Sequence, residues 1–353
     1  RNQNGDTEYG LRKWDKNDFT SRDDDVFKER LYCIRYVHEY IDNNGKLRSE
    51  RYYVAPSEND KLREDKVAKL LTDYFDEWQL KGYIPSSEIE EGEKTNELMR
   101  TRGWKYWHQL FNPRQLLMLG LIQKNVDEMA ESTLERVVGL LLIHRCCDWN
   151  SKLCRWGVGQ ARESLAQTFY NQAFNTMWEY GSRALPLMEG VYNLNFSGIS
   201  ESKIFEKTIR VEDARVINNI CDIWITDPPY ADAVNYHELS EFFLAWDKKL
   251  LKKAFPEWYA DSKRVLAVRG RDETFNKSMI EIYSNLAQHM PDDGIQIIMF
   301  THQDVSVWAD LAMIVWSAGL QVTAAWNIAT ETDASGLKDG NYVKGTVLLV
   351  LRK

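Results

Sequence analysis

The second half of the chain alternates short apolar runs with longer amphipathic stretches, and this alternation limits the fold more than any other feature. Strands alternating with helices are typical of an α/β sheet whose strands run mostly parallel. We predict strands at residues 208–211, 222–226, 294–300, 320–330 and 342–351, and helices at 237–251, 274–290 and 305–318. The Gly/Asp/Ser-rich residues 331–341 leave no room for a crossover helix, so the last two strands should form an antiparallel hairpin.

The start of the chain predicts a lead-in segment and a small hairpin. Residues 1–26 are polar and acidic, and we interpret them as a linker. Between residues 27 and 56, β-forming residues lie on both sides of Asp42-Asn43-Asn44-Gly45. An Asn-Gly turn between two such runs is typical of a β-hairpin.

A block of helices is predicted to follow the hairpin. Ser57 with Asp60 three residues later predicts a capped helix that ends at Gly82. Three more helices are predicted, one opening with Pro113, one from Thr133 to Asp148 and one from about Glu163 to Tyr180. We therefore divide the chain into a helical insertion at 57–190 and an α/β half at 191–353.

Charge is unevenly distributed along the chain. The net charge is 45 minus 53, or −8, which argues against a protein that coats nucleic acid nonspecifically. Residues 57–97 hold most of the acidic excess, whereas residues 98–126 contain basic residues, no acidic ones and several aromatic side chains. The overall sum therefore hides a candidate basic, aromatic surface.

Composition also bears on compartment and metal binding. No run approaches eighteen apolar residues, so no membrane-spanning helix is predicted. The five cysteines form no C-x-x-C pair and no His/Cys cluster with metal-ligand spacing, and their odd number argues against a disulfide framework. We expect a reduced, cytoplasmic protein without a metal site.

The sharpest local feature is the apolar run Ile223-Trp224-Ile225-Thr226 leading directly into Asp227-Pro228-Pro229-Tyr230. Ligands of open α/β sheets bind at the carboxyl ends of strands, where this tetrapeptide should lie. Consecutive prolines carry no N–H and have a fixed φ, so the loop should be stiff and rich in hydrogen-bond acceptors. The alternative interpretation is a simple turn.

Asp-Pro-Pro-Tyr resembles the signature of the amino-group DNA methyltransferases, which have a Rossmann-like sheet. By this resemblance, the Asp227 carboxylate and the Pro228 carbonyl each accept one N–H of the target amino group, and Asp227 tempers the charge that develops on nitrogen. Pro229 holds the loop, and Tyr230 stacks on a base rotated out of the duplex. An Asp at the first position favours adenine over cytosine.

Other segments resemble one group of adenine-specific DNA methylases, which carry an N-terminal domain of unknown function and are often found in phage-defence clusters. The matching segments are residues 104–117, 150–156, 168–178, 235–236, 239–243, 293–294 and 300–302. The resemblance implies transfer of a methyl group from S-adenosyl-L-methionine to N6 of adenine in double-stranded DNA. Subunits of a defence system are the implied protein partners.

The resemblance assigns a cofactor site only in part. Asp213 with Ala214 is similar to the acidic position that contacts the cofactor's adenine, and Thr226 and Asp227 should border the methionine end. The family's glycine-rich loop, Asp-Pro-Phe-x-Gly-x-Gly, does not occur in the chain. We expect an upstream segment or a partner chain to supply it.

Basic and aromatic side chains are the candidates for DNA contacts, since lysine and arginine neutralise phosphates and aromatics stack on bases. They are Trp104, Arg114, Arg155, Trp156, Asn235, Tyr236, Lys248, Lys249 and Lys252. The alternative for each basic segment is an ordinary solvated face, and for Arg114 a tie between helices.

Two further functions remain open at this level. A DNA-binding or scaffold subunit that has lost cofactor binding would explain the missing glycine-rich loop. Methylation of RNA or of a protein glutamine would suit the flat pocket that the proline loop implies.

Overall fold

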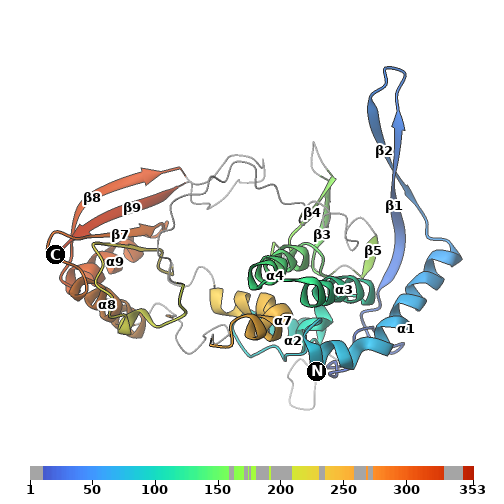
Figure 1. Ribbon diagram of the computed structural model, residues 1–353, viewed down its shortest axis with the longest axis horizontal. Helices are drawn as coiled ribbons and strands as arrows, with labels where there is room; N and C mark the ends of the chain where they lie inside the picture. The colour runs from blue at the N-terminus through green and yellow to red at the C-terminus, as the bar shows by residue number, and fades with distance from the viewer. Residues whose placement is uncertain are drawn as a thin grey trace, which may run out of the picture. The chain divides into compact units, whose positions relative to one another are not determined.

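The computed structural model of the chain describes residues 11–158, 163–170, 174, 176–179, 191, 209–229, 235–257, 268, 273–329 and 345–353 (Figure 1). The chain forms two compact units, one of residues 1–204 with 238–262, and one of residues 205–237 with 263–353. Each unit has its own hydrophobic core. Among the described residues, no helix combines the length and the apolar character needed to cross a bilayer.

The predicted β-hairpin is confirmed. β1 (Arg30–Ile41) pairs antiparallel with β2 (Leu47–Val54), and the Asp42 carboxylate accepts the backbone N–H groups of Asn44 and Lys46 in the turn. The start of β1 also pairs parallel with β5 (Met177–Glu179). Leu31 and Ile34 are buried there, so only the base of the hairpin is anchored in the unit.

The predicted cap of the first helix is also confirmed. α1 (Glu58–Lys81) begins after Ser57, whose hydroxyl accepts the N–H of Asp60 while the Asp60 carboxylate accepts the N–H of Ser57. The helix ends at Gly82, whose φ of 85° is a left-handed conformation that suits glycine. Local polar side chains and one glycine therefore set both ends.

In the described part of this unit, four more helices follow α1: α2 (Thr95–Arg102), α3 (Pro113–Met129), α4 (Thr133–Asp148) and α7 (Tyr236–Ala254), with a 3-10 turn at Trp107–Leu110. The predicted bounds of α4 and the Pro113 start of α3 are confirmed. From Glu238 onward α7 belongs to this helical unit. Its Trp246 ring packs edge-on against Phe111 at 4.9 Å, so a helix that follows the proline loop in sequence completes the helical core.

The predicted helix from Glu163 to Tyr180 is wrong. The described residues form β4 (Glu163–Ala166), which pairs antiparallel with β3 (Arg155–Val158), and β5. Between these strands, the Thr168 hydroxyl donates to the Asp148 carbonyl and lies 2.8 Å from the Ser151 hydroxyl, so local polar contacts replace helical ones. Sheet partners thus override the helical spacing of the sequence.

Residues 11–26 contain no helix or strand, but they do not behave as a free linker. Trp14 is buried in the helical core, and its backbone N–H donates to the Gly103 carbonyl. The Arg12 guanidinium bonds the carboxylates of Asp18 and Asp25 and holds the pKa of the Asp25 carboxyl below its ordinary value. This segment is therefore packed on the helices.

The described residues of the second unit form a four-stranded sheet with α8 (Glu273–Gln288) and α9 (Val305–Ser317) packed against it. The strand order is β6 (Ile223–Thr226), β7 (Ile295–Phe300), β9 (Thr346–Arg352) and β8 (Gln321–Ile328). β6 and β7 are parallel, and β9 runs antiparallel to both of its neighbours. The prediction of an α/β sheet ending in an antiparallel hairpin is confirmed at this level.

One predicted strand in this unit is wrong where it is described. Residues 209–211 carry no strand, and Ile209 and Val211 are exposed. A 3-10 turn at Ala214–Val216 follows, and the Asn285 amide of α8 donates to the carbonyls of Ala214 and Ile217. The segment before β6 is therefore attached to a helix, without strand pairing among the described residues.

Candidate functional site

Asp227 directly follows the last residue of β6, as the sequence predicts. Trp224 packs against the core of the unit, whereas Ile223 and Ile225 alternate with it and are exposed. The Asp227 side chain is exposed, and Pro228 and Pro229 are half-buried. Tyr230 lies outside the described residues. The strand therefore presents an acidic residue and two prolines at its carboxyl end.

Thr226 fixes the end of β6 to its surroundings. Its hydroxyl lies 3.3 Å from the Ile297 carbonyl of β7 and 3.4 Å from the hydroxyl of Tyr283 in α8. Burial, with a smaller contribution from the negative charge of Asp227, raises the pKa of Tyr283 to about 12. A Tyr283 that stays protonated can donate a hydrogen bond beside the loop at any physiological pH.

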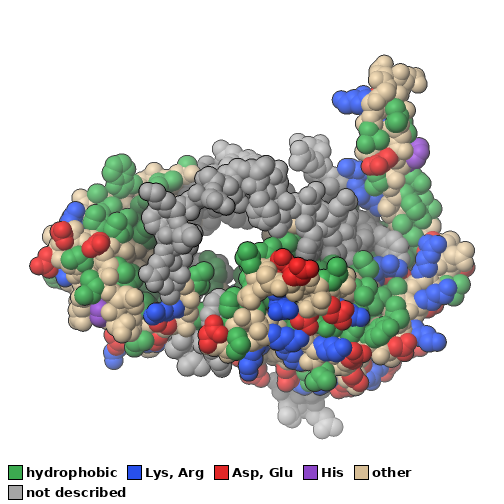
Figure 2. Space-filling view, in the orientation of Figure 1, with side chains coloured by type: hydrophobic (Ala, Val, Ile, Leu, Met, Phe, Trp, Pro, Cys, Tyr) green, Lys and Arg blue, Asp and Glu red, His purple; other side chains and the backbone are tan. Residues whose placement is uncertain are grey.

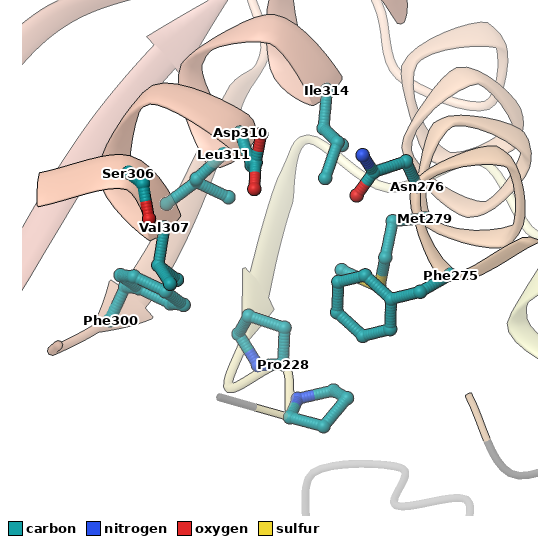
Figure 3. Close-up of a pocket in the computed structure, with 11 residues that line it drawn as sticks. Pro228, Phe275, Asn276, Met279, Phe300, Ser306, Val307, Asp310, Leu311 and Ile314 are labelled. Atoms are coloured by element: carbon teal, nitrogen blue, oxygen red, sulfur yellow. The ribbon is translucent and has the colours of Figure 1, made fainter. Parts of the chain in front are cut away.

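A cavity of about 190 Å³ opens beside the two prolines. Figure 3 shows Phe275 and Met279 of α8 facing Val307 and Leu311 of α9 across it, with Pro228 at one edge. The cavity therefore lies where β6 and β7 end and α8 and α9 begin. This is the place at which open α/β sheets bind ligands.

The lining of the cavity is an apolar interior with three polar side chains. Asn276, Ser306 and Asp310 are the polar members, and Phe300 and Ile314 complete the apolar wall. Ligand pockets usually enclose about 300–1,000 Å³, so this cavity suits a single ring system rather than a whole nucleotide cofactor. This arrangement suits a flat ring that lies between the apolar walls and forms hydrogen bonds with the polar side chains.

The predicted cofactor residues Asp213 and Ala214 are already engaged within the chain. The Asp213 carboxylate accepts two bonds from the Arg215 guanidinium, at 3.0 Å from Nε and 2.7 Å from a terminal nitrogen. Arg215 holds the pKa of the Asp213 carboxyl below its ordinary value. The Ala214 carbonyl accepts from Asn285. Both groups already have hydrogen-bond partners within the chain, so these two residues do not form an open ligand site.

Two predicted DNA contacts, Trp104 and Arg114, serve the helical core. Trp104 is 1% exposed and packs edge-on against Trp14 and Phe174. The Arg114 guanidinium of α3 donates to the Glu64 carboxylate of α1, with a 2.8 Å bond from Nε. The expected basic, aromatic surface at residues 98–126 is therefore not formed by most of its aromatic residues, because Trp104, Trp107 and Phe111 lie in the core, whereas Tyr106 is half-buried.

The three predicted lysines of α7 differ in their roles. Lys249 donates its ammonium protons to the carbonyls of Gln79 and Leu80 at the end of α1. Partial burial, with Lys16 nearby, lowers the pKa of Lys249. Lys248, Lys249 and Lys252 are all exposed on this helix, and the carbonyl contacts set Lys249 apart. Lys248 and Lys252 still fit the prediction of phosphate contacts, whereas Lys249 stabilises a helix end.

The remaining predicted DNA contacts lie at the starts of β3 and α7. Arg155 and Trp156 open β3, where the Arg155 guanidinium stacks over Tyr170 and the Arg35 guanidinium of β1 over the Trp156 ring, at 5.0 and 5.1 Å. Asn235 immediately precedes α7, and Tyr236 is its exposed first residue. Among the described residues, the predicted site residues that lie together beside the cavity are Thr226, Asp227, Pro228 and Pro229.

Sequence reasoning missed the helix residues that line the cavity. Phe275, Asn276, Ser306 and Val307 all lie in the first turns of helices next to strand ends. The N-cap Asp304, which accepts the N–H of Ser306, was the available signal for the start of α9. Nothing in the spacing reveals that the two first turns face each other.

Comparison with models of protein families, with curated proteins and with solved structures gives no match to this chain.

Proposed function

We propose that this chain holds the target base in an S-adenosylmethionine-dependent methyltransferase that modifies N6 of adenine in DNA. The supporting observation is the position of Asp227, exposed at the carboxyl end of β6, with Pro228 and Pro229 lining the adjacent cavity. A parallel β6–β7 pair followed by the antiparallel β9 is compatible with the second half of a Rossmann-like methyltransferase sheet. Such a substrate implies a cytoplasmic location.

The chemistry assigned to the loop concerns the amino group of the base. The Asp227 carboxylate and the Pro228 carbonyl each accept one N6–H, which turns the nitrogen lone pair away from the ring and towards the methyl donor. As positive charge develops on nitrogen, the fixed carboxylate stabilises it. The apolar cavity walls would stack on a base that has left the duplex, which offsets part of the cost of unstacking.

The described residues do not fit S-adenosylmethionine by themselves. The Asp213 carboxylate that the resemblance assigns to the cofactor is held by Arg215, and the Ala214 carbonyl by Asn285. When bound, the cofactor supplies the methyl group. We propose that a glycine-rich segment or a partner chain binds the cofactor. The described residues then only hold the base.

Substitution of Asp227 tests this proposal. We expect Asp227→Ala to abolish transfer of labelled methyl groups to adenine-containing duplex DNA, measured with the intact protein and any partner chain that binds the cofactor. Asp222→Ala, which removes an exposed carboxylate just before the opposite end of β6, is the matched control and should transfer normally. Transfer at the normal rate by Asp227→Ala would disprove the mechanism.

A second candidate is a DNA-binding subunit that has lost cofactor binding, and the Asp213–Arg215 pair favours it. Calorimetric titration of S-adenosylmethionine into the chain separates the two candidates. If neither the chain nor its Arg215→Ala variant binds the cofactor, alone or with its partners, the subunit is the better description. Binding by the chain supports the enzyme.

A further inference from the structure

The outer strand of the β1–β2 hairpin is an exposed sheet edge. Residues 36–54 of the hairpin project from the helical unit as a two-stranded arm (Figure 1). Among the described strands, β2 is the end member of the order β2-β1-β5, and every residue of β2 is exposed. A two-stranded hairpin is only marginally stable in water, and a long exposed edge is a template for a further strand. β2 is therefore a candidate interaction edge.

The charge of the arm is balanced, unlike that of the whole chain. Residues 36–54 contain three basic and three acidic side chains, a net charge of 3 minus 3, or 0, whereas the chain carries −8. They are Lys46, Arg48 and Arg51, and Glu39, Asp42 and Glu50. Figure 2 shows side chains of both signs together with hydrophobic ones along the arm. Such a surface does not select a partner of one sign, but it can match a strand that carries the same charges in reverse order.

One hydrogen bond in the turn determines which backbone groups of β2 point outward. The backbone N–H of Asp42 donates to the Lys46 carbonyl at 2.9 Å, so these two residues form a hydrogen-bonded pair. Hydrogen-bonded and non-hydrogen-bonded pairs alternate along an antiparallel ladder. The even-numbered residues of β2 therefore bond to β1, whereas residues 47, 49, 51 and 53 direct their N–H and C=O groups away from it. These outward groups can pair with another antiparallel strand.

Charge selects one register for two antiparallel β2 strands. Outward-pointing residues pair with each other, so the two-fold axis passes through a residue and not between two. With the axis at Ser49, Arg48 lies opposite Glu50 of the second copy, and Glu50 opposite Arg48 of that copy. An axis at Arg48, Glu50 or Arg51 places that charge against its own copy, an axis at Leu47 places Arg48 against Lys46, and axes at Tyr52 or Tyr53 oppose no unlike charges. Ser49 is thus the axis that opposes unlike charges without opposing like ones.

Both charged side chains are available for these contacts. Glu50 is exposed and forms no ion pair within the described part of the chain. The Arg48 guanidinium bonds the Asp42 carboxylate through Nε at 2.8 Å, which leaves its terminal nitrogens for a second carboxylate. The symmetric pairing then contains two Arg48–Glu50 contacts, one on each side of the axis.

The same register covers apolar surface at the tip of the arm. Ile41 and Leu47 oppose each other there and are 71% and 64% exposed. In the pairing about Ser49, Arg51 of the second copy lies opposite Leu47 on the same face. The aliphatic part of an arginine side chain packs well on apolar surface, so it shields the leucine from water.

We propose that two copies of this chain associate by antiparallel pairing of their β2 strands about a two-fold axis at Ser49. The backbone groups of Leu47, Ser49 and Arg51 then bond to those of the second copy, and the two hairpins form one continuous four-stranded sheet. More than two strands give a sheet the stability that a lone hairpin lacks. A pairing of this symmetry is closed, so association stops at the dimer.

Charge reversal tests the register. Sedimentation velocity of the intact chain at rising concentrations should show a monomer–dimer equilibrium. Glu50→Arg places two pairs of like charges opposite each other, so we expect it to raise the dissociation constant of the dimer by about tenfold or more. Adding Arg48→Glu to this variant restores unlike charges and should recover most of the affinity. Glu39→Arg makes the same charge change on β1, away from the shared edge, and is the control that should dimerise normally.

A cysteine at the axis tests the geometry. Opposed Cα atoms of a hydrogen-bonded pair lie about 5.5 Å apart, which is within the range of a disulfide. Ser49→Cys should therefore give a covalent dimer under mild oxidation, seen on a non-reducing gel. Leu47→Cys is the matched control, because its counterpart lies four residues, or about 14 Å, along the ladder. The parent chain, with its five cysteines, gives the background.

Three results would overturn the proposal: a parent chain that stays monomeric, a dimer that Glu50→Arg does not weaken, or equal cross-linking of the two cysteine variants. The first is expected if a strand of another protein covers β2, and the second if the copies associate through another surface. The inference does not depend on methyl transfer. Asp227→Ala leaves the arm intact and should dimerise as the parent chain does, so failure of either proposal is seen separately.

Discussion

The carboxylate of Glu238 in α7 accepts the backbone N–H of Thr95, the first residue of α2, at 2.9 Å. It also accepts the N–H groups of Glu93 and Lys94, both at 3.0 Å, so three successive amides enclose it. Gly92 lies so close that a Cβ there would stand 2.5 Å from the carboxylate carbon. A buried acid from α7 thus serves as the N-terminal cap of a distant helix.

Removal of this cap should loosen α2. Hydrogen bonds to a buried charged group contribute about 1.5–3 kcal/mol, so we expect Glu238→Ala to destabilise the helical unit by about that amount. Amide hydrogen exchange should accelerate most at residues 93–95. Glu238→Gln, which keeps the shape and one acceptor oxygen, should have a smaller effect. Unchanged exchange at these amides in the Ala variant would contradict the capping role.

The buried pair of His144 and Asp247 should make stability depend on pH. Nε2 of His144 lies 2.6 Å from the fully buried Asp247 carboxylate, and burial raises the pKa of Asp247 above its ordinary value of 3.8, although the bond to His144 opposes this. A raised pKa in the folded state means that the Asp247 carboxyl stays protonated to a higher pH in the native protein than in the unfolded chain. The contribution of Asp247 to stability is therefore complete below pH 3.8 and is lost as the pH rises through the raised pKa.

Urea denaturation of the chain and of its Asp247→Asn variant measures this contribution. We expect the difference in free energy of unfolding, parent minus variant, to fall as the pH rises above 3.8 and then to level off. Asp292→Asn, at a fully exposed carboxylate, should show no comparable fall. A difference that increases with pH would contradict the assignment.

Lys249 should affect stability rather than DNA binding. Its ammonium group bonds two carbonyls at the C-terminus of α1. A positive charge is also favourable there, because the helix dipole places partial negative charge at that end. We expect Lys249→Ala to lower the free energy of unfolding by about 1–2 kcal/mol. Affinity for duplex DNA, measured by fluorescence anisotropy, should stay unchanged for this variant and fall for Lys248→Ala with Lys252→Ala. The opposite ranking would restore Lys249 as a DNA contact.

Filling the cavity should block the base. Asn276 lies on its wall, and Asn276→Phe places a bulky ring there without cutting into the buried core. We expect methyl transfer to fall by about tenfold or more, equal to about 1.4 kcal/mol, with the melting temperature unchanged. Lys277→Phe, at the next and exposed position of α8, is the control and should transfer normally. Equal activity of the two variants would exclude the cavity as the base site.

Elements with local signals were predictable from the sequence. The capping box of Ser57 and Asp60, the Pro113 start of α3 and the alternation of strands and helices after Gly190 each depend on residues a few positions apart. The segment from Glu163 was not predictable in this way, because its strands exist only through pairing with β3 and β1. The same holds for Trp104 and Arg114, whose types suit a surface or a core equally well.

The sequence by itself determined the helix ends, the hairpin turn and the position of Asp227 after an apolar strand, since short-range hydrogen bonds and backbone preferences suffice for these. Only the tertiary structure decided that Trp104, Trp107 and Phe111 fill a core, that Lys249 and Glu238 serve helix ends, and that α8 and α9 form a cavity beside Pro228. These outcomes depend on which surfaces are buried together. Contacts between residues far apart in the chain settle that, and local spacing does not encode them.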